Sequence, residues 1–142
     1  KVKVLLERLE RFKDTSLLVI GDTIVDQYAA CEALGMSAEA PVIVARELGS
    51  KKYIGGAGIV ALHTRALGAK CCYLSVVGDD KNANFFADQL DHQQIDHVLL
   101  TDASRPTTEK IRYMVDHQKL FRLSRLKDHE LPKLDMIPLQ LP

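Results

Sequence analysis

The chain has 142 residues, of which 46% are hydrophobic and 27% charged, and its nineteen acidic and nineteen basic side chains give a formal net charge of zero. This is the length and composition of one soluble domain with a real core. A chain without net charge has no overall field to draw it to nucleic acid or to an anionic membrane. Its longest apolar runs are too short to span a bilayer, and no signal peptide is visible. We therefore expect neither a nucleic-acid nor a membrane partner.

The three cysteines, Cys31, Cys71 and Cys72, form no recognisable metal or disulfide pattern. Adjacent cysteines rarely pair, and none of the three has the spacing of a zinc site. We expect reduced thiols in a cytoplasmic protein. The five histidines also lack the spacing of metal ligands. Metal-assisted hydrolysis and cysteine catalysis are both disfavoured.

The first elements are a helix and a strand. Apolar residues at helical spacing predict an amphipathic helix over residues 2–12. The continuous apolar run 16–20, stopped by a glycine, predicts a strand buried on both faces. Carboxylates just past the end of such a strand lie where open α/β sheets bind ligands. Asp22 and Asp26 are therefore candidate binding residues, although Asp22 would serve equally well as a plain turn residue.

A glycine cluster, Gly55, Gly56 and Gly58, leads directly into a helical pattern that ends at Gly68. Glycine amides can approach a ligand closely, and the start of a helix offers unpaired N–H groups to oxygens and anions. The alternative is that the glycines only let the helix pack tightly on a strand. The cluster is not a Walker A loop, because no Gly-Lys-Ser/Thr follows, and Ala61 stands where a dinucleotide fingerprint needs its third glycine.

The segments around this cluster indicate an alternating α/β order. Residues 27–41 have no period and are predicted to be irregular, whereas 42–48 read as a strand. After the glycine helix, residues 70–77 form a second apolar strand, followed by a helical pattern over 83–90 and a strand over 97–100. Strands alternating with helices predict right-handed βαβ units and a parallel sheet.

Beyond residue 106, hydrophobic and polar residues alternate with a period of two, as in a β-strand. From Thr107 to Val115, apolar side chains point to one face and polar ones to the other, and a hairpin turn at 116–119 leads into a returning strand. Lys110 and Arg112 share the polar face, which suits a phosphate or a polyhydroxyl ligand. The alternative is an ordinary solvated face of an antiparallel ribbon. Residues 132–142 show no period and are expected to be an irregular tail or a joined segment.

Six motifs together resemble those of the ribokinase-like (PfkB) carbohydrate kinases, and most closely the heptose-phosphate kinases that form the kinase part of bacterial ADP-heptose synthases. One such motif is weak, but these occur in family order over residues 16–125. They are Val19-Ile-Gly-Asp-Thr-Ile-Val-Asp-Gln-Tyr28, Glu39-Ala-Pro-Val42, Gly55-Gly-Ala-Gly-Ile-Val-Ala61 with Leu67-Gly-Ala69, Val77-Gly-Asp-Asp80, Arg105-Pro-Thr-Thr-Glu-Lys-Ile-Arg112 and Gln118-Lys-Leu-Phe-Arg122.

The resemblance implies a doubly wound α/β domain with a small β-sheet lid. Residues 1–131 would be the N-terminal, substrate-binding portion, with lid strands near 24–48 and 107–123. The family's first-strand aspartate binds sugar hydroxyls, which carries over to Asp26 and less directly to Asp22, and its double glycine carries over to Gly55 and Gly56.

Lys110 and Arg112 match the lid strand and would meet the substrate phosphate. The resemblance further implies ATP and Mg²⁺ as cofactors and a homodimer formed through the lid.

Two departures from the family pattern bear on activity. Ile59 stands where the family has a sugar-binding asparagine, and an isoleucine side chain can neither donate nor accept a hydrogen bond, so sugar choice should differ. The family's Gly-x-Gly-Asp motif, whose aspartate is the catalytic base, is absent from the chain together with the accompanying ATP-binding segments. The sequence therefore presents a sugar site without visible catalytic machinery.

Two functions follow from these observations. The first is the substrate-binding half of a kinase that transfers the ATP γ-phosphate to a sugar or sugar phosphate, expected to be a heptose 7-phosphate. The second is a non-catalytic sugar-phosphate-binding module or a truncated fragment. A dinucleotide-binding oxidoreductase is disfavoured, because the strand after the glycine helix ends in Val77-Gly78 without the acidic residue that binds ribose.

Overall fold

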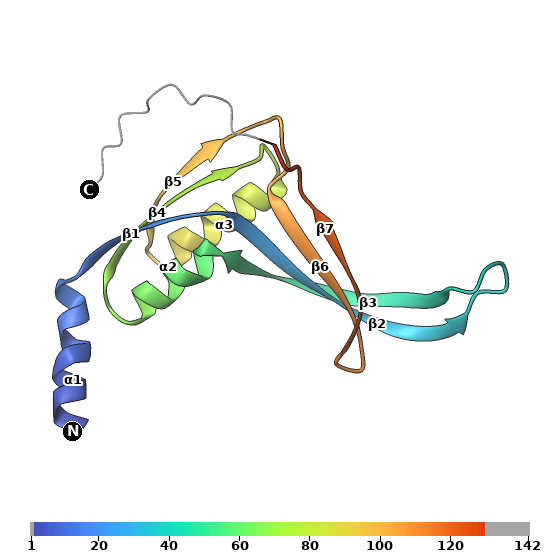
Figure 1. Cartoon of the computed structure of the whole chain (residues 1–142), viewed down its shortest axis with the longest axis horizontal. Helices are drawn as coiled ribbons and strands as arrows, with labels where there is room; N and C mark the ends of the chain where they lie inside the picture. Colours follow the sequence, from blue (N-terminus) through green and yellow to red (C-terminus); the bar gives the residue numbers. More distant parts are fainter. Residues whose placement is uncertain (1, 130–142) are drawn as a thin grey trace.

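The computed structural model describes residues 2–129, which form a three-stranded parallel sheet, a four-stranded mixed sheet and three α-helices (Figure 1). The tail predicted at 132–142 lies outside the described residues. Helix α1 (Val2–Glu10) continues into a 3₁₀ turn (Arg11–Asp14), as the helical spacing of its apolar residues predicted. Among residues 2–129, no helix is both long enough and apolar enough to cross a membrane.

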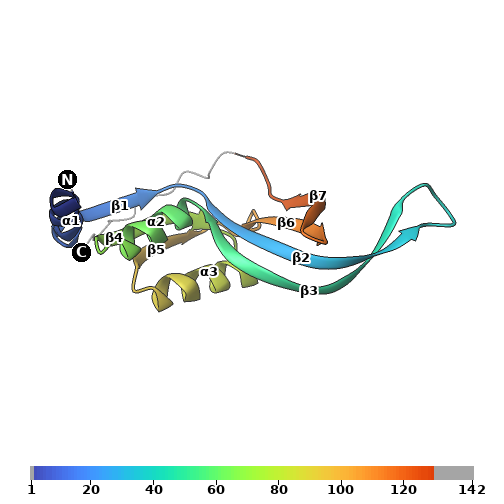
Figure 2. The same ribbon diagram turned by 90° about the horizontal axis from the view of Figure 1, so that it is seen from below.

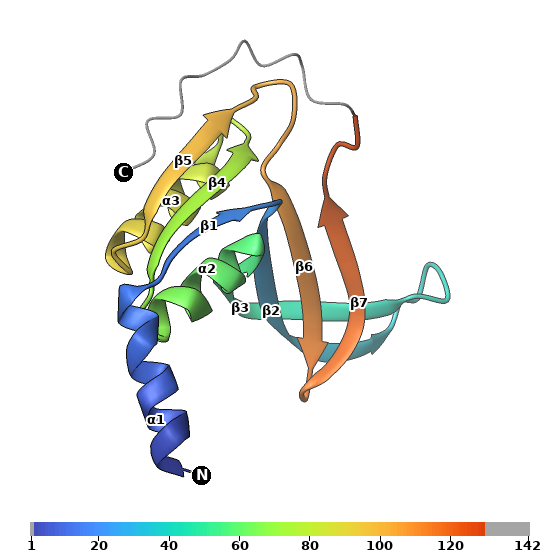
Figure 3. The same ribbon diagram turned by 60° about the vertical axis from the view of Figure 1, so that its left-hand side comes forward.

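The parallel sheet has the strand order β1 (Ser16–Ile20), β4 (Lys70–Val77), β5 (Asp96–Thr101). Helix α2 (Ala57–Ala66) precedes β4 and helix α3 (Lys81–His92) connects β4 to β5, so the predicted alternation of helices and parallel strands is confirmed (Figure 3). Side chains of α2 and α3 pack on one face of this sheet. The core there contains Tyr73 and Phe86, whose rings stack with centroids 5.6 Å apart.

The prediction that residues 16–20 are buried on both faces was wrong for the described part of the chain. Most of β1 is exposed, and β4 alternates between buried and half-buried positions along its length. The cause is that α2 and α3 cover the face that carries Val19 and Tyr73, while Leu18 and Ile20 on the other face remain exposed. The apolar run correctly indicated a strand. It did not indicate that both faces of the strand are covered within residues 2–129.

The mixed sheet has the strand order β3 (Ile43–Gly56), β2 (Thr23–Met36), β6 (Thr108–Val115), β7 (Gln118–Arg125). Strand β2 pairs antiparallel with β3 and parallel with β6, and β6 and β7 form the predicted hairpin. The long β2–β3 ribbon extends well beyond the other two strands (Figure 2).

The prediction of an irregular segment at 27–41 was wrong over most of its length. Strand β2 continues to Met36, and only the turn before Ile43 is irregular. Two register shifts, between Ala30 and Cys31 and between Ala33 and Gly35, interrupt its pairing with β3. Each shift changes the phase of the inward and outward side chains, which hides the period of two in the sequence.

A buried hydrogen-bond network joins the two sheets where β1 passes into β2. The Thr23 hydroxyl donates to Oγ of Ser75 at 2.8 Å and lies 3.1 Å from the Tyr73 hydroxyl. Oγ of Ser75 in turn donates to the carbonyl oxygen of Gly21 at 2.6 Å. Because buried hydroxyls are costly to leave unpaired, this network fixes the point where the mixed sheet leaves the body of the domain.

Candidate functional site

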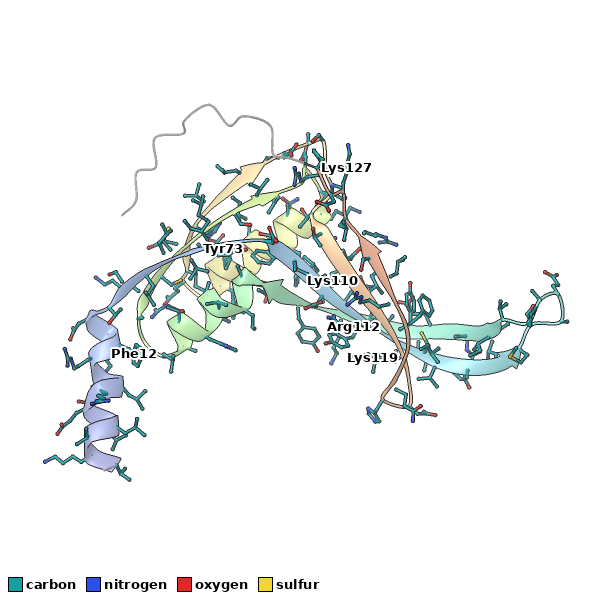
Figure 4. All side chains as sticks on the ribbon, in the orientation of Figure 1. Phe12, Tyr73, Lys110, Arg112, Lys119 and Lys127 are labelled. Atoms are coloured by element: carbon teal, nitrogen blue, oxygen red, sulfur yellow. The ribbon has the colours of Figure 1, made fainter. Side chains whose placement is uncertain are left out.

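One face of the mixed sheet brings together the polar residues singled out in the sequence. Asp26 on β2 is directly opposite Lys110 on β6, and Tyr28 is directly opposite Arg112. Tyr53 on β3 is opposite Asp26 from the other side. Residues paired in this way point to the same face of a sheet. Lys110 and Arg112 accordingly follow each other along β6 (Figure 4).

Asp26 and Arg112 form an ion pair at the centre of this face. Nη1 of Arg112 donates to Oδ1 of Asp26 at 2.5 Å, and both side chains are more than three-quarters buried. The guanidinium carbon also lies 5.1 Å from the centroid of the Tyr28 ring. The guanidinium is thus held between two groups: the carboxylate of Asp26 binds it by an ion pair, and the ring of Tyr28 contacts it in the geometry of a cation–π interaction.

The aromatic rings of Tyr28 and Tyr53 form walls beside this pair. Their centroids are 5.8 Å apart with nearly perpendicular planes. Together with Asp26 and Ile54 they line a shallow hollow of about 400 Å³ that is open to solvent. Mostly apolar walls with one or two fixed polar groups are typical of small-molecule sites.

The glycine cluster lies at the inner end of the same ribbon. Gly55 pairs with Ile24, and a Cβ atom at this position would overlap the carboxylate of Asp26. Gly56 has a positive φ of 58° and precedes α2. A Cβ atom at Gly56 would overlap the carbonyl oxygen of Asp22. Gly55 is therefore required by the close approach of Asp26, and Gly56 by its positive φ and the close approach of Asp22.

The other candidate residues have more ordinary surroundings. Gly58 is buried in the first turn of α2 against Phe86 and Ile54, which favours the tight-packing alternative for this glycine. Asp22 lies at the turn after β1 with an exposed side chain, and its carbonyl oxygen accepts a hydrogen bond from the amide of Ala57 at 3.1 Å. Ile59 is 39% exposed in the first turn of α2.

The loop after β4 holds the start of β6 in place. Oδ2 of Asp80 accepts from the amide of Thr107 at 2.8 Å, while its Oδ1 caps α3 by accepting from the amide of Ala83 at 2.9 Å. The amide of Gly78 donates to Oγ1 of Thr107 at 2.9 Å. Burial opposes ionisation of Asp80, but these donated hydrogen bonds outweigh it and lower the pKa of the carboxyl below its usual value. The strand that carries Lys110 and Arg112 is thereby tied to α3.

Sequence reasoning missed Tyr28 and Tyr53 as parts of this site. The predicted strand at 42–48 ended before Tyr53, and Tyr28 fell in a segment predicted to be irregular. The available signal was the pair of aromatic residues flanking the aspartate and the glycines. This signal identifies a site only when the register of β2 and β3 is known, because the register places Tyr53 opposite Asp26.

The assembled groups can bind but have no visible means of activating a substrate. They offer a carboxylate acceptor, a guanidinium, an ammonium and two aromatic walls. Among residues 2–129, no group of three or more histidine, cysteine or acidic side chains is placed to hold a metal ion. A ligand with hydroxyl groups and an anionic group matches this set of partners.

Comparisons with known proteins agree on one family. Residues 14–131 match the model described as "pfkB family carbohydrate kinase". The chain is 36% identical over 110 residues to a "Bifunctional protein HldE" of Rhodopseudomonas palustris, covering 77% of this chain and 22% of that protein. It is 39% identical over 119 residues to the protein of the same name from Campylobacter jejuni, covering 84% of this chain and 24% of that protein. The chain therefore spans about a quarter of the length of these relatives.

Solved structures share the fold. A carbohydrate kinase from Agrobacterium tumefaciens superposes with a TM-score of 0.64 at 17% identity, over 78% of this chain and 35% of that one. The Arabidopsis thaliana ribokinase solved with ribose and ATP gives a TM-score of 0.62 at 17% identity, over the same shares. The fructokinase of Halothermothrix orenii gives 0.60 at 22% identity, over 85% and 41%. The expected ribokinase-like α/β fold is thus confirmed.

Proposed function

The chain belongs to the pfkB family of carbohydrate kinases, and from this premise we propose that it is the sugar-binding part of an enzyme that phosphorylates a sugar phosphate. The substrate we propose is a heptose 7-phosphate. The observation that carries the proposal is the Asp26–Arg112 ion pair with Lys110 beside it on the same face. One carboxylate next to two cations is suited to a ligand that carries both hydroxyl groups and a phosphate.

Each residue has a role in this proposal. Asp26 accepts hydrogen bonds from sugar hydroxyls, and the close backbone of Gly55 and Gly56 offers its amides to the sugar. Lys110 and Arg112 bind the phosphate that the substrate already carries.

Ile59 and Asp22 lie beside these groups. The exposed side chain of Ile59 lies near the glycines, at the position where the family has a hydrogen-bonding asparagine, so the choice of sugar should differ. Asp22 contributes through its backbone carbonyl, which positions the start of α2.

Neither the sequence motifs nor the groups present in residues 2–129 fit ATP or Mg²⁺. The sequence contains no Gly-x-Gly-Asp segment, and residues 2–129 contain no cluster of metal ligands. In-line phosphoryl transfer needs a nucleotide, a metal ion and a positioned nucleophile. We therefore assign ATP binding, Mg²⁺ binding and the catalytic base to polypeptide outside these 142 residues.

The test is an ADP-release assay on the complete polypeptide that carries this sequence. We expect turnover with a heptose 7-phosphate and at least about tenfold lower kcat/KM with the unphosphorylated heptose, since charge-assisted hydrogen bonds to the phosphate would be lost. Asp26→Asn should raise the KM for the sugar phosphate by about tenfold or more on the same grounds. Equal kcat/KM values for the two sugars, or an unchanged KM in the variant, would contradict the assignment.

A non-catalytic sugar-phosphate-binding module is the second candidate, favoured by Ile59 and by the missing catalytic motif. It predicts that the complete polypeptide binds the sugar phosphate in calorimetry but releases no ADP. The kinase proposal requires both binding and turnover. The two measurements therefore separate the candidates.

We also propose a homodimer formed through the outer part of the β2–β3 ribbon, in the cytoplasm. This part of the ribbon exposes several large apolar side chains that protrude from the body of the domain: Leu34, Met36, Val42, Ile43 and Leu48. An exposed apolar patch of this kind is typical of a protein–protein contact. The three cysteines are free thiols, which agrees with a reducing compartment.

A further inference from the structure

A buried carboxylate lies on the apolar side of β6, opposite to the proposed ligand face. Glu109 is the neighbour of Lys110, but its side chain points to the other side of the sheet and is only 3% exposed. It shares that side with Ile111, which is buried among Ala29 and Cys31. A charged group is rarely buried without partners, so the surroundings of Glu109 need an explanation.

Three residues from three other elements meet at this carboxylate. Oε1 of Glu109 lies 3.0 Å from Nζ of Lys52 on β3, and Oε2 accepts from Nη1 of Arg125 on β7 at 2.8 Å. The side chain of Asn82, in the first turn of α3, donates to the same carboxylate. Nζ of Lys52 also donates to Oδ1 of Asn82 at 2.5 Å. We call Lys52, Asn82, Glu109 and Arg125 the Glu109 cluster.

The cluster adds a polar contact between the mixed sheet and α3, beside the packing of Val25 and Ile54 with Phe86 and the hydrogen bond from Thr107 to Asp80. Lys52, Glu109 and Arg125 belong to three strands of the mixed sheet, whereas Asn82 belongs to a helix packed on the parallel sheet. Burial opposes ionisation of Glu109, but the hydrogen bonds and charges of Lys52, Arg125 and Asn82 outweigh it, and the pKa of the carboxyl is lowered. The carboxylate is therefore ionised at neutral pH and needs all its partners.

We propose that Glu109 is a positioning residue that fixes the mixed sheet relative to α3 and so holds Lys110 and Arg112 over the body of the domain. If the sheet swung away from α3, the buried carboxylate would lose Asn82 and the link from Lys52 to the helix. Glu109 does not touch the ligand in this inference. It acts through the strand that it shares with Lys110 and Arg112.

This inference rests on the proposed function for its kinetic consequence but not for its structural one. In the complete polypeptide, Asn82→Ala removes the hydrogen bonds between the Glu109 cluster and α3 without changing the strands, and Glu109→Gln keeps the shape of the side chain but removes its charge. Glu32→Gln is the matched control, because Glu32 pairs with Arg46 across the same ribbon on an exposed surface of the sheet.

We expect Asn82→Ala and Glu109→Gln to raise the KM for the sugar phosphate by about tenfold, as is usual for residues coupled in one network. The KM for ATP and kcat should stay within about twofold of wild type, and Glu32→Gln should change none of them. Without any substrate, hydrogen exchange at the amides of Thr107 and Ala57 should also be faster in both variants than in wild type. These two residues lie where the chain passes between the two sheets.

The outcomes separate this inference from the proposed function. If the wild type does not phosphorylate the sugar but the two variants still speed exchange at Thr107 and Ala57, the proposed function fails and the positioning role stands. If exchange and KM in both variants match those of Glu32→Gln, the positioning role is wrong. It is also wrong if kcat and both KM values change together with the melting temperature, because that pattern belongs to a general loss of stability.

Discussion

Arg112 reaches across the parallel pairing of β2 and β6 to bind Asp26, so the carboxylate and the guanidinium neutralise each other on the proposed ligand face. Because Arg112 has further N–H donors, it can bind a phosphate while one N–H stays on Asp26. A phosphate that drew it away would release carboxylate oxygens for sugar hydroxyls. The ion pair thus links the two halves of the proposed ligand.

Arg112→Lys tests this link, because lysine keeps the charge but has no planar fork and stacks poorly on Tyr28. We expect the Kd for the sugar phosphate to rise by about tenfold in calorimetry, and the Kd for the unphosphorylated sugar to change less than about threefold. Arg46→Lys, on an exposed pair of the same ribbon, is the control. An equal rise in Kd for both sugars would mean that Arg112 only positions Asp26 and does not bind the phosphate.

Gly58 should not tolerate a side chain. A Cβ atom there would overlap Phe86 and Ile54 in the core, so Gly58→Ala should destabilise the protein by about 1–3 kcal/mol. Gly49→Ala is the matched control, because nothing lies within 4 Å of a Cβ atom at that strand position. Thermal unfolding measures both. A melting temperature for Gly58→Ala as high as that of Gly49→Ala would show that the core there can rearrange.

The sequence was sufficient to predict the parallel sheet and the hairpin because their patterns are local. The apolar run at 70–77 and the alternation around Ile111 each persist through a whole element, and both elements were found near the predicted bounds. Strand β2 was missed because bulges break its alternation. The inner half of β3 was missed because Gly49-Ser-Lys-Lys52 has no apolar period.

The candidate site was predictable only in its separate parts. The sequence indicated Asp26 as a residue after a strand, and Lys110 and Arg112 as a polar strand face. That Asp26 and Arg112 touch, and that Tyr28 stacks on the guanidinium, depends on a parallel pairing between segments 86 residues apart. No local pattern encodes such a pairing.

Asp80 should contribute to stability in a pH-dependent way. The pKa of its carboxyl is lowered in the folded state, so its contribution is complete above the pKa of the unfolded chain and is lost as pH falls through the folded value. The pKa of Asp102, lowered to about 2 by the hydroxyl and amide of Ser104, acts in the same direction. We therefore expect the melting temperature to fall steadily as the pH is lowered from about 5 to 2.

Asp80→Asn should make the melting temperature decrease less steeply as the pH is lowered. Asparagine can still cap α3, but its single oxygen cannot serve both Ala83 and Thr107, so stability at pH 7 should drop by about 1 kcal/mol. Asp79→Asn, at the exposed neighbouring position, should leave both the stability and its pH dependence unchanged. Identical melting curves for the two variants would contradict the role given to Asp80.

The outer ribbon should carry the dimer contact. Met36 and Ile43 pair directly across β2 and β3, and their side chains are 64% and 60% exposed. Ile43→Lys places a charge in the middle of this apolar surface, which should weaken a dimer at least about tenfold. Sedimentation of the complete polypeptide should show a dimer for the wild type and a shift toward monomer for Ile43→Lys. Ser50→Lys adds the same charge at an exposed polar position of β3 and should leave the dimer intact. A monomeric wild type would contradict the proposed dimer. Equal dimerisation of both variants would show that the contact does not lie on the outer ribbon.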